Sequence, residues 1–160
     1  MKKIIFSLIF ISGISLNIYA QDLNKMMDNL AKAENAVHQV IDQKTLNTSL
    51  GSHKDKKPSF MDKITGMEVV AIENGSTDLK DNLIKELAAF KDGNGYETLL
   101  TVKDGGDNVH IISHKENESL SHIYIIAIDD EDIAFVKMSG NLSKEDMIKI
   151  VEEQKKNSNK

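Results

Sequence analysis

The stretch YETLLTVKDGGDNVHIIS, residues 96–113, decides the fold, because two runs of strand-forming residues flank a tight turn signal. Leu100 and Val102 alternate with polar neighbours, which is the pattern of a strand with one buried face. Residues 104–107, Asp-Gly-Gly-Asp, are of the types that a hairpin turn selects. The stretch therefore predicts an antiparallel β-hairpin.

The chain beyond the hairpin repeats this pattern of strand and turn twice. Residues 115–118 turn the chain into an apolar run over 122–128, and the acidic residues 129–132 turn it again into a run over 133–138. Together with the hairpin, these runs predict a four-stranded antiparallel meander.

Capping residues predict helices on either side of the meander. Residues 67–73 predict a further strand, after which Ser76 or Thr77 caps a helix whose apolar residues share one face. Ser143 caps a last helix, and Asp146, three residues on, completes a capping box.

An apolar stripe at helical spacing runs from residue 23 towards residue 40, and its first half predicts a helix. Residues 36–42 also hold β-branched residues in a mixed polar and apolar pattern, as a half-buried strand does. Helix and strand both remain open for this segment. The stripe spans too few heptads for a coiled coil, so we expect it to face the core.

These elements predict an α+β fold of two layers, with helices packed on one face of an antiparallel sheet of five or six strands that ends in the four-stranded meander. A sheet with one solvated face needs only one layer of helices. We expect residues 21–46, an N-terminal helix and strand, to join residues 60–153 in a single core. The composition of residues 47–59 predicts a flexible loop, and residues 154–160 predict a disordered tail.

The first 20 residues have the pattern of a secretory signal peptide. Lys2 and Lys3 precede an apolar run, and the segment ends in a small residue, so we expect cleavage after Ala20 and a periplasmic or secreted protein with no membrane span. A retained N-terminal anchor is the alternative, but the apolar part covers only about a dozen residues, where a bilayer requires about 20.

The composition excludes several classes of chemistry. The 160 residues include no cysteine, which rules out thiolate catalysis, iron–sulfur ligation, zinc knuckles and disulfides. All 20 basic residues are lysine, against 25 acidic residues and a formal net charge of −5. An acidic chain that lacks the bidentate arginine fork is poorly suited to nucleic acid, so we expect no nucleic-acid partner.

Three histidines are the strongest candidates for a chemical site. His110 and His114 project from the same face of one predicted strand, and His122 begins the next strand. Three imidazoles could hold zinc or copper, which makes a metal-binding protein or a metal-dependent hydrolase the alternative function. However, His110 and His114 lie about 13 Å apart along a strand, whereas metal ligands lie roughly 2 Å from the ion. We therefore predict ordinary polar strand positions and no metal or other cofactor.

The register of the turn after His114 decides whether the three imidazoles meet. If the turn is centred on Asn117, His122 lies opposite Ile112 and all three imidazoles share one face. A slip of one residue places His122 opposite Ile111, on the other face.

Other motifs of catalysis or binding have the wrong spacing. The acidic turn 129–132 lacks the glycine and the glutamate that an EF-hand loop requires later in its sequence. The chain holds no Gly-x-Ser-x-Gly elbow and no phosphate-binding Gly-Lys-Ser/Thr. We therefore expect no enzyme and assign no catalytic or cofactor-binding residue.

The hairpin also carries a resemblance to a known family. Gly95-Tyr96-Glu97, then Val102-Lys103-Asp104-Gly105-Gly106 and Asn108-Val109, followed by a paired strand, an acidic turn and a short last helix, resemble the domain of unknown function family 4252. The resemblance covers residues 60–152 and, more loosely, 22–46, where it favours a strand at 37–41 and a short helix near Lys44. Asp42 stands where the family pattern has serine.

The resemblance implies exported proteins of Gram-negative bacteria with no established activity and no catalytic residues to carry over. It also implies genes near extracytoplasmic sigma-factor regulators, and hence a role in the cell envelope or in stress.

We therefore expect an exported, non-catalytic binding protein of the cell envelope that is a monomer and has an unknown protein partner. Its binding surface would be the open sheet face or the final strand, residues 133–138, acting as an edge that accepts a partner strand. A third interpretation is an envelope assembly subunit that uses the N-terminal apolar stripe.

Overall fold

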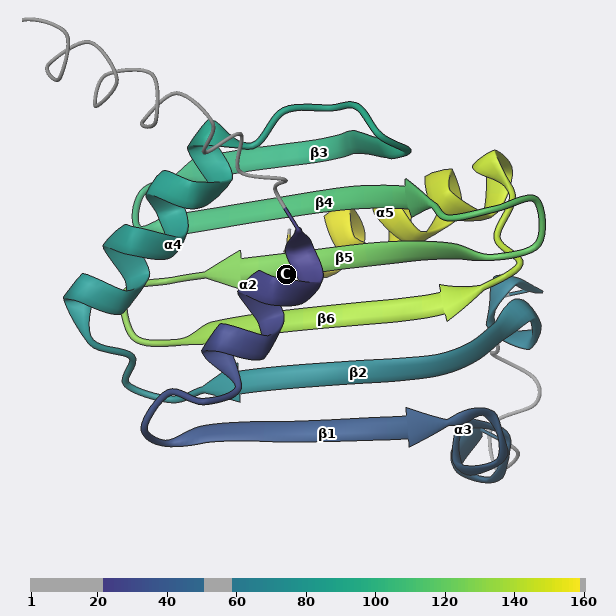
Figure 1. Cartoon of the computed structure of the whole chain (residues 1–160), viewed down its shortest axis with the longest axis horizontal. Coiled ribbons are helices and arrows are strands. Elements are labelled where there is room, and N and C mark those ends of the chain that lie inside the picture. Colours follow the sequence, from purple (N-terminus) through teal and green to yellow (C-terminus); the bar gives the residue numbers. More distant parts are fainter. Residues whose placement is uncertain (1–21, 51–58, 159–160) are drawn as a thin grey trace, which may run out of the picture.

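Six antiparallel strands form one open sheet in the order β1-β2-β6-β5-β4-β3 in the computed structural model, which describes residues 22–50 and 59–158 (Figure 1). The strands are β1 (Ala36–Asp42), β2 (Ile64–Ile72), β3 (Tyr96–Asp104), β4 (Asp107–Lys115), β5 (Ser121–Ile128) and β6 (Ile133–Gly140). The helices are α2 (Leu23–Leu30), α3 (Gln43–Leu50), the 3-10 helix η2 (Ser59–Lys63), α4 (Thr77–Ala89) and α5 (Lys144–Ser158). The predicted α+β class and the meander of β3, β4, β5 and β6 are confirmed.

Strand β6 lies in the middle of the sheet. It pairs with β5 on one side and with β2 on the other, where the register runs from Ile72 opposite Ile133 to Ile64 opposite Gly140. The expectation that residues 133–138 form an edge strand is therefore wrong, because long-range pairing with β2 covers the edge that a simple meander would leave open. The two edges of the sheet are β1 and β3.

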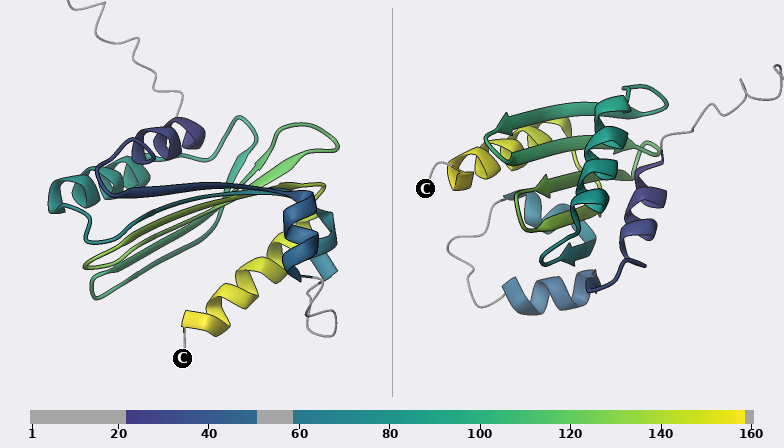
Figure 2. Two further views of the ribbon diagram at one scale, coloured as in Figure 1. Left: turned by 90° about the horizontal axis from the view of Figure 1, so that it is seen from below. Right: turned by 90° about the vertical axis from the view of Figure 1, so that its left-hand side faces the viewer.

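Apolar side chains cover both faces of the sheet, because successive residues of β4 and β5 are apolar. Ile112 and Tyr124 pack on one face and Ile111 and Ile123 on the other, and each is at most 1% exposed. Helices α2 and α4 pack on the first, which we call the α2 face, whereas α3, η2 and α5 pack on the second, the α5 face (Figure 2). The helices thus form a layer on each face and not, as expected, on one face only, since each apolar face needs a cover.

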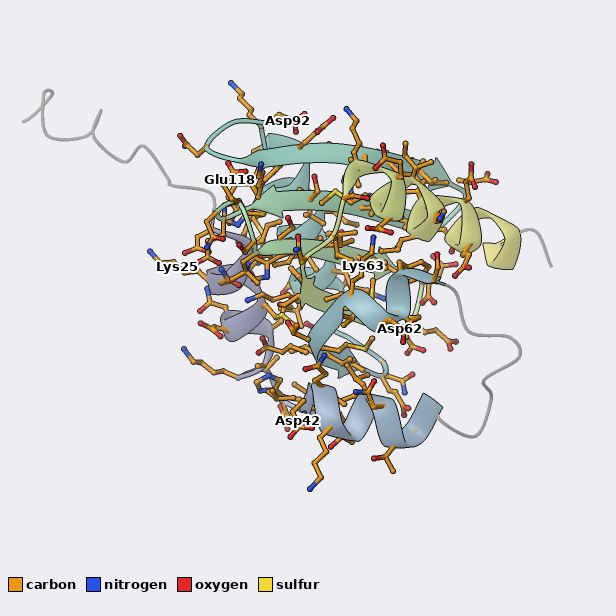
Figure 3. The ribbon with its side chains drawn as sticks, turned by 90° about the vertical axis from the view of Figure 1, so that its right-hand side faces the viewer. Lys25, Asp42, Asp62, Lys63, Asp92 and Glu118 are labelled. Atoms are coloured by element: carbon orange, nitrogen blue, oxygen red, sulfur yellow. The ribbon has the colours of Figure 1, made fainter. Side chains whose placement is uncertain are left out.

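Side-chain hydrogen bonds confirm the two predicted helix caps. At the start of α4, the Leu79 N–H donates to Ser76 Oγ at 3.3 Å. At the start of α5, the Ser143 N–H donates to Asp146 Oδ2 at 2.8 Å, and the Asp146 N–H donates to Ser143 Oγ at 3.3 Å. Lys63, at the end of η2, is labelled in Figure 3. It donates to the same carboxylate at 2.6 Å, which lowers the pKa of Asp146 to about 2 and ties η2 to α5.

Residues 36–42 form strand β1, which pairs with β2 along its whole length, so the strand is the correct alternative for this segment. At the end of the strand, Asp42 Oδ1 accepts a hydrogen bond from the Thr45 N–H at 2.8 Å. This bond satisfies a backbone group at the start of α3, which is the short helix that the resemblance implied near Lys44.

Three further expectations concern the loop and the chain ends. Helix α3 includes the first residues of the expected loop 47–59, and residues 51–58 lie outside the described part of the chain. Helix α5 continues to Ser158, where the sequence predicts a disordered tail over 154–160. The predicted signal peptide, residues 1–20, also lies outside the described residues. None of the described helices combines the length and the apolar character needed to cross a bilayer.

Candidate functional site

Four side chains from neighbouring strands form one row across the α2 face. The row, which we call the histidine row, consists of Tyr96 (β3), His114 (β4), His122 (β5) and Ser139 (β6), each opposite the next in the register of the sheet. The rings of Tyr96 and His114 are stacked, with centroids 4.0 Å apart and planes 11° apart. The ring centroids of His114 and His122 lie 5.9 Å apart. The row is thus a continuous strip of stacked rings that ends in a hydroxyl group.

His122 is the centre of a hydrogen-bond chain within this row. Its Nδ1 lies 2.8 Å from Ser139 Oγ, and its Nε2 lies 2.7 Å from Glu116 Oε2. Burial lowers the pKa of His122 even though the neighbouring carboxylate opposes this shift, and the hydrogen bond from His122 lowers the pKa of Glu116. A neutral imidazole that donates from Nε2 to Glu116 accepts a hydrogen bond from the Ser139 hydroxyl group at Nδ1.

Ser139, His122 and Glu116 have the connectivity of an acyl-transfer triad, in which a histidine links a serine to a carboxylate. Two features of the geometry oppose catalysis. First, the serine contacts Nδ1 of the histidine, whereas the serine of a catalytic triad contacts Nε2. Second, β6 pairs with β2 and β5, so the backbone N–H groups around Ser139, which would have to form an oxyanion hole, take part in the sheet. The chain of hydrogen bonds satisfies both ring nitrogens of a buried imidazole.

Gly95 shapes the end of the histidine row. Its φ is +86°, and a Cβ at this position would lie 2.7 Å from the carbonyl oxygen of Lys115 and 3.2 Å from Cδ2 of His114. The Lys115 N–H donates to the Gly95 carbonyl at 2.9 Å and closes this contact. Only glycine fits such an approach, which gives a physical reason for the glycine that precedes Tyr96. Beside it, His114 Nδ1 is buried and has no hydrogen-bond partner among the described residues.

Tyr124, which follows His122 by two residues on the same face of β5, anchors α2 to the sheet. Its hydroxyl donates to Asn24 Oδ1 at 3.2 Å, and Lys137 Nζ donates to the same oxygen at 2.7 Å. Lys137 Nζ also lies 5.9 Å from the centroid of the Tyr124 ring. Burial raises the pKa of Tyr124 well above its ordinary value, so the hydroxyl stays protonated and keeps its role as a donor.

The three predicted histidines share the α2 face but do not converge. His122 lies opposite His114, a register that differs from both expected ones, because the turn is centred one residue later, on Glu118. Within this turn, Asn117 Oδ1 accepts hydrogen bonds from the N–H groups of residues 119 and 120. His110 lies four residues along β4 and hydrogen-bonds through Nε2 with Asn108 Oδ1 at 2.8 Å. Within residues 22–50 and 59–158, no three histidine or acidic side chains form a group that could hold a metal ion.

No sequence pattern indicated that Tyr96, Glu116 and Ser139 would contact His114 and His122. The Gly95-Tyr96-Glu97 motif was a signal for Tyr96 itself. Glu116 and Ser139 come together only through the register of the turn and the pairing of β5 with β6.

Two carboxylates of the acidic turn 129–132 accept hydrogen bonds from backbone N–H groups. Asp129 Oδ1 accepts hydrogen bonds from the N–H groups of Glu131 at 2.8 Å and Asp132 at 2.6 Å, and these bonds lower the pKa of Asp129. Asp132 Oδ1 accepts the Asn74 N–H at 3.1 Å. These are the bonds of a hairpin tip, as the sequence predicts.

A groove of about 350 Å³ opens on the α5 face, between the sheet and the start of α5. Lys115 Nζ lies 3.5 Å from Glu118, and Lys144 Nζ lies 3.9 Å from Glu97. Because each lysine in the lining has a carboxylate beside it, the groove offers no excess charge that would select a charged ligand.

The two edge strands differ in their protection against pairing with another strand. The register of β3 shifts between Thr98 and Leu100, which is a bulge, and the strand carries charged residues near both of its ends, at Glu97, Lys103 and Asp104. Strand β1 pairs regularly with β2 over all of its 7 residues. It exposes Val37 on the α5 face and Val40 on the α2 face, with exposed fractions of 55% and 74%. We call this strand with its two valines the β1 edge; no other described strand lies beyond it (Figure 1).

Comparison with known proteins gives one family. A family model described as "Domain of unknown function (DUF4252)" matches residues 17–150. No curated protein and no solved structure matches the chain. The matched segment includes all six strands, and therefore both the histidine row and the β1 edge.

Proposed function

The chain belongs to the DUF4252 family of domains of unknown function, and on this premise we propose that it is an exported, non-catalytic binding protein of the bacterial cell envelope. The signal-peptide pattern of residues 1–20 supports export. The gene neighbourhood that the resemblance implies makes envelope-stress regulation the process in which partners are sought first. Its molecular function is to bind a protein partner at the β1 edge.

The exposure of Val37 and Val40 on an unprotected edge strand carries this proposal. An edge strand presents a row of unpaired backbone N–H and C=O groups on its outer side. A partner strand that pairs with β1 would satisfy these groups and cover one valine on each face of the sheet. Backbone hydrogen bonds would then supply affinity, and the valines would select apolar side chains in the partner.

The polar clusters also favour binding over turnover. His122 is hydrogen-bonded to Ser139 and Glu116, and Tyr124 is hydrogen-bonded to Asn24. Side chains that satisfy one another inside the fold are not free to converge on a reactant.

Photo-crosslinking in intact cells tests the proposal. A photoreactive side chain is placed at Val40, and matched controls carry it at Val102 on the opposite edge, which is 38% exposed, and at Ile148 of α5, which is 51% exposed. We expect specific adducts from position 40 and none from the two controls. Position 40 without adducts, or the same adducts at all three positions, would show that the β1 edge is not the binding surface.

A further inference from the structure

We propose that the strand which completes the β1 edge is β1 of a second copy of this chain, in place of the monomer that the sequence analysis expects. This inference rests on the proposed function, because it names the partner of the same edge. The two copies would pair their β1 strands antiparallel about a twofold axis, so that both sheets join into one.

Gln39 is the middle residue of the seven-residue strand AVHQVID. When two antiparallel copies are centred on Gln39, Val37 of one copy lies opposite Ile41 of the other, and Val40 lies opposite His38. Each exposed valine thereby gains an apolar or aromatic cross-strand neighbour on its own face, which is the kind of pair that stabilises a sheet.

Charge does not oppose this pairing. Asp42 is the only acidic residue of β1, and the centred register places its two copies at opposite ends of the interface. They are about 20 Å apart along the strands, well beyond the Debye length of about 8 Å at physiological ionic strength. The carboxylate of Glu68 near the middle of the edge lies 2.8 Å from His38 of its own copy.

The elements at the two ends of β1 leave on opposite faces of the sheet. The chain reaches β1 from α2, which packs on the α2 face, and it continues into α3, whose Leu46 packs on the α5 face (Figure 2). In the centred register, the α2 connection of one copy lies beside α3 of the other. Because these two elements are on different faces, they do not obstruct the approach of the strands.

The small size of the contact sets its strength. Two paired strands of 7 residues bury less surface area than a standard protein interface does. We therefore expect weak, concentration-dependent association. The bulged and charged strand β3 does not offer an equivalent edge, which makes it the matched control within the same chain.

Disulfide trapping tests the proposed register. The chain has no cysteine, so a single introduced thiol reports only on its own contact. In Gln39→Cys the two thiols would meet at the twofold axis, where opposite residues have Cα atoms about 4.5–5.5 Å apart, within the range that a disulfide spans. Under mild oxidation we expect Gln39→Cys to form dimers about tenfold faster than Val102→Cys. The double variant Gln39→Cys with Val40→Lys should form dimers no faster than Val102→Cys, because a charged side chain then faces the neighbouring copy.

Each possible result is decisive. Equal rates for Gln39→Cys and Val102→Cys would overturn the inference, as would an unchanged monomer mass of the unmodified protein in sedimentation from about 1 to about 200 µM. Circular dichroism verifies that each variant is folded. If the photoreactive side chain at Val40 then captures a different protein, the proposed function stands and only self-pairing fails. If it captures nothing, both fail.

Discussion

Replacing Gly95 by alanine tests the close packing at the end of the histidine row. A φ of +86° costs a residue with a side chain about 1–2 kcal/mol. The new Cβ would also lie 2.7 Å from the Lys115 carbonyl oxygen, so the backbone must shift, which adds about 1–3 kcal/mol. We therefore expect Gly95→Ala to lower the free energy of unfolding by about 2–5 kcal/mol.

Gly105→Ala is the matched control. Gly105 has a φ of +59°, and a Cβ there would meet no atom within 4 Å, so its substitution carries only the conformational cost of about 1–2 kcal/mol. Urea unfolding followed by far-UV circular dichroism measures both variants, and near-UV dichroism reports on the tyrosine rings, including the Tyr96 ring that stacks on His114. Equal losses of stability in the two variants, with an unchanged tyrosine signal, would refute the reasoning.

Four further predictions concern the hydrogen-bonded side chains. The pKa of Asp146 is lowered from 3.8 to about 2, so its carboxylate stabilises the fold above about pH 4, and this contribution is lost as the pH falls towards 2. Asp146→Asn should therefore be less stable than wild type in urea melts at pH 7, and this difference in stability should shrink as the pH falls from about 4 to about 2. Burial lowers the pKa of His122, so protonation favours the unfolded chain, and stability should fall as the pH drops below about 6.5; His122→Gln should flatten the stability curve between about pH 7 and pH 5. Tyr124→Phe removes the hydrogen bond to Asn24 and should cost about 1 kcal/mol in the same melts. A fluorophosphonate probe should label the native protein at Ser139 no more than it labels a heat-denatured sample, and labelling specific to the native state would reveal an activated serine.

Short-range patterns predicted the meander because its strand and turn signals lie within a few residues of one another. The pairing of β2 with β6 is different, since no local signal says which of two distant strands will be neighbours. The helix layer on the α5 face did have a signal. Residues 121–128, SHIYIIAI, are apolar at successive positions, which is typical of a strand buried on both faces.

The histidine row depends on two registers that patterns alone do not fix. The turn centred on Glu118 places His122 opposite His114. The bulge in β3 adds one residue and brings Tyr96 opposite His114. If the regular register of residues 100–104 continued without a bulge, Tyr96 would lie opposite Lys115 and its ring would point to the other face of the sheet.

The β1 edge could be predicted only in part. The β-branched residues of 36–42 indicated a strand, but their pattern fitted a helix as well, and nothing in the sequence separated an edge strand from an interior one. The exposure of Val40 follows from the order of the six strands, which is a property of the whole sheet.

A photo-crosslinking scan along β1 and β3 in intact cells tests most directly whether the chain binds its partner at the β1 edge. We predict adducts from the exposed positions of residues 36–42 and none from those of residues 96–104. Adducts confined to β3, or to the neighbourhood of the histidine row, would contradict the assignment of binding to β1.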